Sequence, residues 1–289
     1  MKQPGDEVLF DRQEPEAYPL SKNLELDNDR SIFSALRQEM ISKEQMRGDA
    51  LIQYCTQQIS RFNKFRLDPY VLAQPSRLPE VNEASIVPRI GYHGEDLAAT
   101  LYHLSETKAP ELDRIRDRVK EIDPEFRDFE FSTVGTDRIA FAAAYADTRK
   151  SVPSVRLSSG MLIYMGLVVL VSTPNRPPVL MIEEPENGLT PQAVKPFYRA
   201  VRQLAHNENR EQRSQVIVSS HSPFVICEAW NGEDRDFIYQ MKVVDGKAQV
   251  RKFSEVITGH QIQLGKDESG KRTHLSLATA EEVMSGYLS

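Results

Sequence analysis

The 289-residue sequence contains two cysteines, one tryptophan and no long apolar run. Two cysteines, Cys55 and Cys227, cannot form the disulfide framework of a small secreted protein, and their spacing is not that of a metal site. The longest uncharged stretch, residues 157–175, is interrupted by glycine and too polar at its ends for a membrane span. The acidic N-terminus lacks the apolar core of a signal peptide. We therefore expect a protein of a reducing compartment, the cytoplasm, without a membrane partner.

The overall composition is that of a globular chain, with 40% hydrophobic residues, 27% charged residues and a net charge of -6. These values exclude a disordered tail and a fibre. The length corresponds to one or two domains with enough chain to bury a core. The mild acidity does not exclude nucleic acid as a partner, because a local basic patch can bind what the whole chain repels.

The first half of the chain is irregular in pattern. Apolar residues at helical spacing predict two helices, over 32–41 and 51–62, which we interpret as a helical arm within residues 1–65. At the end of this arm, the basic and aromatic stretch Arg61–Arg66 is an ordinary helix end or a grip for nucleic acid. Residues 66–150 are interpreted as a connector with intervening elements. These elements are helices over 97–104 and 110–122 and strands over 129–134 and 138–145.

The second half, residues 151–289, is more regular. It is predicted to contain an apolar helix over 161–171 and then a strand, a helix and a strand over 178–182, 191–204 and 215–219. Short apolar strands separated by a helix predict an α/β fold with a parallel sheet covered by helices on both faces. The pair Asp245-Gly246 predicts a terminal β-hairpin, which we expect to close that sheet.

Three motifs of this half carry the chemistry: LSSG (157–160), VLMIEEPENGL (179–189) and QVIVSSHSP (215–223). A helix N-terminus such as that after LSSG suits a phosphate, and Gly160 allows close approach. Acids that follow a buried strand lie where ligands bind open α/β sheets. One acid can hold Mg²⁺ while the next activates water, and a histidine after the neighbouring strand reaches the same phosphate. Taken singly, each motif has an ordinary explanation: a helix cap for LSSG, a surface loop for the acids and a structural role for His221. Their order and strand contexts favour a site.

Together the motifs resemble the C-terminal half of an ABC-type ATPase of the RecF/SMC-like group, which includes OLD-type and anti-phage ATPases. The resemblance is specific over about residues 150–230, and GYHGEDLAATLYHL resembles a segment that precedes the signature in that group. It implies ATP and Mg²⁺ as cofactors, with Glu183 as the Walker B metal ligand, Glu184 as the general base and His221 as the switch histidine. It further implies nucleotide contacts from the signature and the D-loop, at Ser158, Ser159, Gly160, Asn187 and Gly188. Glu183 replaces a more common aspartate, and Thr190 stands where relatives often carry Asp or His.

The phosphate-binding loop of such ATPases, G-x-x-x-x-G-K-[ST], does not precede Leu157. The nearest match, over 265–273, has Arg272 where a hydroxyl should bind the metal and two acids where a phosphate would lie, so we interpret it as a solvated loop. The resemblance implies that the loop precedes the arm, and the chain is expected to begin after it. Without the phosphate-binding loop, ATP loses several hydrogen bonds of ~1.5–3 kcal/mol each, so the chain alone should be a weak or inactive ATPase. Truncation, a split ATPase and decay remain open as explanations.

The resemblance implies a head-to-head dimer, homodimeric or heterodimeric, in which an N-terminal P-loop lobe or a full-length ATPase subunit completes the site. It implies a role in DNA maintenance or anti-phage defence. The alternative is a non-catalytic interaction module that pairs with another ATPase subunit or binds DNA. A nuclease-linked OLD-type protein is disfavoured, because residues 222–289 are fewer than the ~100–150 of a compact domain.

Overall fold

The computed structural model describes residues 62–78, 88–146, 151–173, 176–209, 213–232, 234–244, 247–260, 262–266, 270 and 272–285. These residues belong to one compact unit, Phe62–Ser289. The helices predicted over 32–41 and 51–61 lie outside the described residues. Within these ranges, every helix is too short or too polar to traverse a lipid bilayer.

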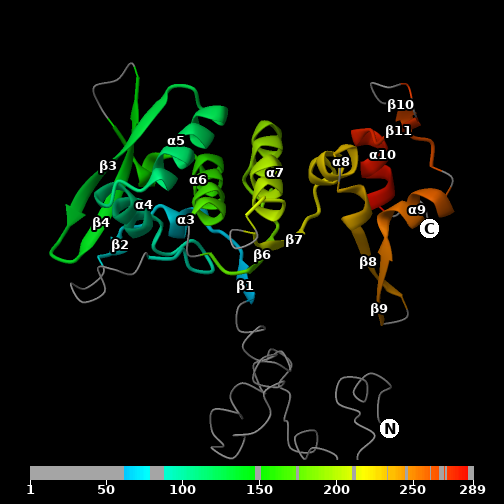
Figure 1. Ribbon diagram of the computed structural model, residues 1–289, viewed down its shortest axis with the longest axis horizontal. Helices are drawn as coiled ribbons and strands as arrows, with labels where there is room; N and C mark the ends of the chain where they lie inside the picture. Colours follow the sequence, from blue (N-terminus) through cyan, green and yellow to red (C-terminus); the bar gives the residue numbers. More distant parts are fainter. Residues whose placement is uncertain are drawn as a thin grey trace, which may run out of the picture. The chain divides into compact units, whose positions relative to one another are not determined.

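The central feature is a three-stranded parallel sheet with the strand order β1-β6-β7 (Figure 1). Its strands are β1 (Phe62–Phe65), β6 (Val179–Glu183) and β7 (Gln215–Ser219). The register aligns Phe65 with Ile182 and Ile182 with Val218. Because all three strands run in the same direction, the residues that follow them meet at one edge. The α/β class and the two strands predicted in the second half are confirmed, whereas Phe62, expected in a helix, begins a strand.

Two helices, α6 (Ser159–Ser172) and α7 (Pro191–Ala205), share one apolar core with the sheet. The residues of α6 from Leu162 to Ser172 are all buried, as expected for a helix that is apolar on every side. Leu180 and Ile182 of β6 pack into this core. The alternate sheet face carries Ile217, which is 43% exposed. The expectation of helices on both faces stays a prediction.

A second, antiparallel sheet with the order β2-β4-β3 packs into the same core (Figure 1). Two helices cover it, and the predicted helices and strands of this region are confirmed. The stretch predicted as an irregular connector contains one short helix and one short strand. The elements are α3 (Pro69–Leu72), β2 (Ser76–Arg77), α4 (Leu97–Glu106), α5 (Pro110–Ile122), β3 (Phe126–Val134), β4 (Arg138–Tyr145), β5 (Val152–Pro153) and η3 (Ser154–Arg156).

The residues after β7 pack around a second apolar cluster that includes Trp230 and Phe253. The predicted hairpin is confirmed as an antiparallel pair, β8 with β9. It forms a two-stranded sheet of its own, so the expectation that it closes the parallel sheet is wrong. The elements are α8 (Pro223–Asn231), η5 (Arg235–Phe237), β8 (Tyr239–Val244), β9 (Lys247–Lys252), α9 (Phe253–Gly259), β10 (Gly265–Lys266), β11 (Arg272–His274) and α10 (Leu277–Met284).

The nearest match to a phosphate-binding loop lies in this second cluster. Its first residues form β10, which pairs antiparallel with β11. A phosphate-binding loop instead connects a strand to the N-terminus of a helix. The antiparallel pairing of the described residues, Gly265–Lys266 with Arg272–His274, differs from that arrangement.

Candidate functional site

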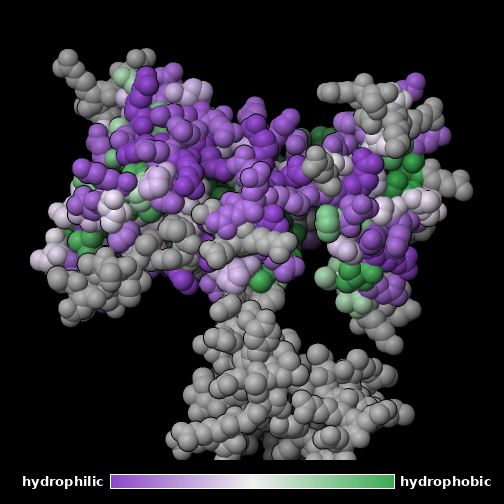
Figure 2. Space-filling model, viewed as in Figure 1, coloured by the Kyte–Doolittle hydropathy of each residue, from purple (hydrophilic) through white to green (hydrophobic). Residues whose placement is uncertain are grey.

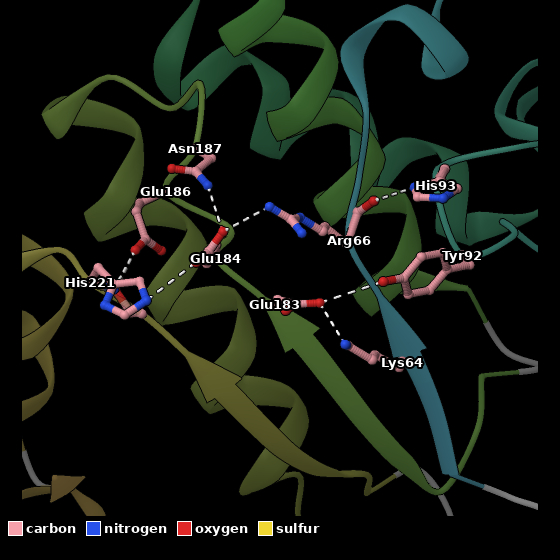
Figure 3. A network of polar contacts seen from close by, with 10 residues as sticks. Lys64, Arg66, Tyr92, His93, Glu183, Glu184, Glu186, Asn187 and His221 are labelled. Atoms are coloured by element: carbon pink, nitrogen blue, oxygen red, sulfur yellow. Dashed lines mark hydrogen bonds and ion pairs between the residues drawn. The ribbon is translucent and has the colours of Figure 1, made fainter. Parts of the chain in front are cut away.

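The acids after β6 and the histidine after β7 come together at the carboxyl edge of the parallel sheet (Figure 3). Glu183 is the last residue of β6, and the Glu184 N–H donates to the carbonyl of Ser219 at 2.9 Å, which continues the strand pairing by one step. His221 Nε2 lies 3.3 Å from Glu184 Oε1. The predicted convergence of these side chains is therefore confirmed as geometry.

The Glu184 carboxylate is contacted from three directions. Arg66 Nη2 lies 3.2 Å from Oε2, the Asn187 amide donates to the same oxygen at 2.9 Å, and His221 approaches Oε1. The backbone of Glu184 has φ +46°, in the left-handed region that residues other than glycine rarely adopt. Such a conformation costs ~1–3 kcal/mol and persists where surrounding contacts hold it, often at functional sites. The three contacts and the backbone turn together fix the direction of this side chain.

The neighbouring carboxylate, Glu183, is paired with a different cation. Lys64 Nζ lies 2.7 Å from Glu183 Oε2, and the hydroxyl of Tyr92 donates to the same oxygen at 3.5 Å (Figure 3). The hydrogen bond from Lys64 is the main reason why the pKa of Glu183 lies below its ordinary value, and it also raises the pKa of Lys64. The lowered pKa of Glu183 stabilises the folded protein above the pKa of this carboxyl in the unfolded chain, and the contribution is lost in acid. The raised pKa of Lys64 stabilises the folded protein below the pKa of this ammonium group in the unfolded chain, and the contribution is lost in strong alkali. The pair is therefore intact at neutral pH.

The structure contradicts one part of the nucleic-acid interpretation of Arg61–Arg66, the stacking of a base on Phe65. Phe65 is buried in the core at 4% exposure and cannot stack on a base. Lys64 and Arg66 face the two glutamates. The described part of that stretch is a strand that contributes cations to the carboxyl edge of the sheet.

A third acid of the same loop, Glu186, joins the two motif loops. Its Oε1 accepts the Ser220 hydroxyl at 2.8 Å and the backbone N–H of His221 at 2.7 Å. Hydrogen bonds to an ionised acceptor are roughly twice as strong as neutral ones. Glu186 therefore holds the His221 backbone against the loop that carries Glu184.

Replacement of Glu186 by Ala should destabilise the protein by ~1.5–3 kcal/mol, because the half-buried Ser220 hydroxyl and the His221 N–H lose a charged acceptor. Glu186→Gln retains one acceptor oxygen and should lose less than half of that amount. Denaturant unfolding measures both changes, with the exposed Glu130→Gln as a control. Equal stability of Glu186→Ala and the wild type would contradict the role of this clamp.

The signature LSSG forms the start of α6, as predicted. Ser158 is the N-cap, and its hydroxyl accepts the Met161 N–H at 3.2 Å. A Cβ atom on Gly160 would lie 2.6 Å from the carbonyl oxygen of Gly188. The physical reason for glycine at this position is thus the close approach of the D-loop backbone, which the sequence analysis did not foresee. The structure brings the signature and the D-loop into contact within one chain.

Four residues of this edge were missed by sequence reasoning: Lys64, Arg66, Tyr92 and Glu186. Tyr92 lies in the GYHGED segment, whose resemblance to a family segment was noticed without any assigned role. The alternation of basic residues at Lys64 and Arg66 indicated an extended segment. The expectation of a helix up to residue 62 obscured this signal. Glu186 was visible in the motif EEPEN, yet a sequence does not reveal which donors a loop acid accepts.

The donor set fits a magnesium ion that is also bound by phosphate. Mg²⁺ in nucleotide sites takes one or two carboxylates, with water and phosphate oxygens as the other ligands. Glu183 is half-buried and already accepts from the ammonium group of Lys64, so this oxygen faces a cation. The described residues contain no group of three or more His, Cys, Asp or Glu side chains that could hold a metal by themselves. Glu183 could serve as one carboxylate ligand of a metal ion that phosphate also binds.

The described residues thus combine a parallel sheet, acids after β6, a histidine after β7 and a helix start at α6 that suits a phosphate. The chain belongs to the family described as "AAA domain, putative AbiEii toxin, Type IV TA system", whose model matches residues 9–227. A sequence search of curated proteins finds no match.

Among solved structures, the chain is similar to SMC ATPase heads. One, from work on ATP-driven dimerization and DNA-stimulated activation of SMC ATPases, is 14% identical with a TM-score of 0.40, over 57% of this chain and 99% of that one. The Smc head of Pyrococcus furiosus bound to the C-terminal domain of ScpA is 11% identical with a TM-score of 0.38, over 56% and 39% of the two chains. The Thermotoga maritima SMC head domain is 15% identical with a TM-score of 0.34, over 54% and 51%.

Proposed function

We propose that this chain is the hydrolytic half of an ABC-type ATPase, which cleaves Mg·ATP when a P-loop lobe is supplied. The observation that carries the proposal is the convergence of Glu183, Glu184 and His221 at the carboxyl edge of the parallel sheet. Glu183 pairs with Lys64 and Glu184 pairs with Arg66, so the direct contacts of the two consecutive acids differ. Separate environments for two carboxylates allow separate chemical roles.

In this proposal Glu183 holds the metal and Glu184 accepts the proton of the attacking water. When bound, Mg²⁺ neutralises charge on the terminal phosphates of ATP. His221 has an 86% exposed side chain, which leaves it accessible to donate a hydrogen bond to the γ-phosphate. Its contact with Glu184 keeps the base and this donor on the same side of the phosphate.

The signature would act on a nucleotide bound by a second subunit. The backbone N–H groups of Ser159 and Gly160 lie at the positive end of α6, where an anion is stabilised. Ser158 caps the helix, while Asn187 and Gly188 link the signature to the base through the D-loop. In a dimer, each signature would complete the nucleotide site of the opposite subunit. The N-terminus of α6 would then bind the nucleotide, and the D-loop would link it to the base.

The P-loop is not among these 289 residues. We therefore propose that it comes from an N-terminal lobe or from a full-length ATPase subunit, in a homodimer or a heterodimer. The domain limits, 1–65, 66–150 and 151–289, and the role in DNA maintenance or anti-phage defence remain predictions. The family description names a putative AbiEii toxin of a type IV TA system.

The alternative function is a non-catalytic module that binds another ATPase subunit or DNA. Both functions predict an ATPase subunit as the partner. Only hydrolysis requires the side chains that contact Glu184. The network of Arg66, Asn187 and His221 around this carboxylate favours the hydrolytic half.

Calorimetry with Mg·ATP tests the proposal. The full chain alone should give no measurable binding heat, because it lacks the backbone cradle that binds the phosphates. Addition of a polypeptide that carries a P-loop lobe should produce both binding and phosphate release. Binding without phosphate release would support the non-catalytic module, and tight binding by the chain alone would contradict the proposed architecture.

A further inference from the structure

Two cations at the end of β1 contact the two consecutive glutamates. Lys64 lies in β1, and Arg66 follows the last residue of this strand, Phe65. Lys64 contacts Glu183, and Arg66 contacts Glu184 across 118 residues of sequence (Figure 3). The two cation side chains are 52% and 54% exposed. Each acid thus has a cation of its own.

We propose that Arg66 is a positioning residue for Glu184 and that the segment 91–95 acts as its support. This proposal rests on the proposed function, since it assigns a residue that directs the general base. Arg66 touches neither ATP nor the attacking water in this proposal. It acts through Glu184, by keeping one carboxylate oxygen bound so that the other is aimed at the water.

The backbone around Arg66 is fixed independently of its side chain. The Arg66 N–H donates to the carbonyl of Tyr92 at 2.9 Å, and the ring nitrogen Nδ1 of His93 lies 3.2 Å from the carbonyl of Arg66. The Asp68 N–H donates to the carbonyl of His93 at 2.9 Å. Three hydrogen bonds therefore join the exit of β1 to the turn that contains Tyr92 and His93. This gives the GYHGED segment a physical role.

Because the Arg66 side chain is 54% exposed, a positioning role and a structural role predict different results for its replacement. Ion pairs between exposed side chains contribute little to folding stability. The direction of a catalytic group matters far more, since a misplacement of about 1 Å can cost 10²-fold in rate. Arg66 is also suited to this task because its planar guanidinium holds a carboxylate in one orientation better than an ammonium group does.

The test compares Arg66→Gln and Arg66→Lys with the control Arg127→Gln, an exposed arginine on β3. The ATPase is the full chain with the P-loop polypeptide. Arg66→Gln should lower kcat about tenfold with KM for ATP unchanged, and Arg66→Lys should restore part of the loss. In a Glu184→Gln background, Arg66→Gln should have no further effect. The melting temperature of each variant should stay within about 2 °C of the wild type.

A second readout needs no turnover. The ¹³C resonance of the Glu184 side-chain carboxyl, assigned by its loss in Glu184→Gln, can be followed in the full chain alone. It should shift in Arg66→Gln and stay unchanged in Arg127→Gln. An unshifted resonance overturns the positioning role whether or not the complex hydrolyses ATP. An equal kcat loss in the Glu184→Gln background also overturns it, while a wild-type complex without turnover contradicts the proposed function alone.

Discussion

Replacement of Glu184 by Gln should reduce phosphate release by the complemented ATPase about 10²–10⁴-fold, the contribution typical of a general base. The amide keeps one oxygen, which can still accept from Asn187, so the loop should retain its shape. The substitution removes proton acceptance and leaves the ATP-binding groups in place. ATP binding, measured by calorimetry, should therefore remain at the wild-type level while phosphate release falls.

The control for this experiment is Glu130→Gln, an exposed glutamate on β3. It should leave both binding and turnover unchanged. Glu183→Gln provides the contrast, since a metal ligand should weaken the binding of Mg·ATP when it is neutralised. If Glu184→Gln weakens binding and Glu183→Gln does not, the two roles are exchanged. Unchanged turnover in Glu184→Gln would remove this residue from the mechanism.

The convergence of the acids and the histidine was predictable because it depends on local patterns. A short apolar strand, a helix that begins at Pro191 and a second apolar strand determine a parallel pair. In a parallel pair the residues after both strands meet at one edge. Glu184 and His221 were therefore brought together by the direction of two strands, which sequence pattern reports well.

The contacts of Lys64 and Arg66 with the two glutamates were not predictable in the same way. The contact between Arg66 and Glu184 spans 118 residues, and no pattern near either residue identifies the other. The apolar spacing before Phe62 favoured a continuous helix, whereas tertiary pairing with β6 makes residues 62–65 a strand. The position of the hairpin was likewise mispredicted, because its turn residues specify a hairpin but not the sheet that it joins.

Gly160 has a steric reason to be glycine that the sequence did not reveal. From the sequence, Gly160 was expected to allow the close approach of a phosphate. The structure brings the carbonyl oxygen of Gly188 to 2.6 Å from the position of a Cβ atom on Gly160. That atom belongs to the backbone, so no side-chain rotation can relieve the clash. Any larger residue must push the D-loop away from the start of α6.

Gly160→Ala should therefore lower the free energy of unfolding by ~1–3 kcal/mol, the usual cost of overpacking. It should also lower turnover of the complemented ATPase about 10²-fold, because Gly188 is joined through Asn187 to the base, and a shift of about 1 Å there misaligns Glu184. Gly259→Ala is the matched control, since a Cβ atom on Gly259 meets nothing within 4 Å.

Denaturant unfolding and phosphate release on the same preparations separate the two effects of Gly160→Ala. A loss of turnover far larger than the loss of stability would mean that contact between the signature and the D-loop sets the geometry of the base. A stability loss with full turnover would mean that the D-loop can move without disturbing Glu184. In that case the signature and the base would act as independent parts of the site.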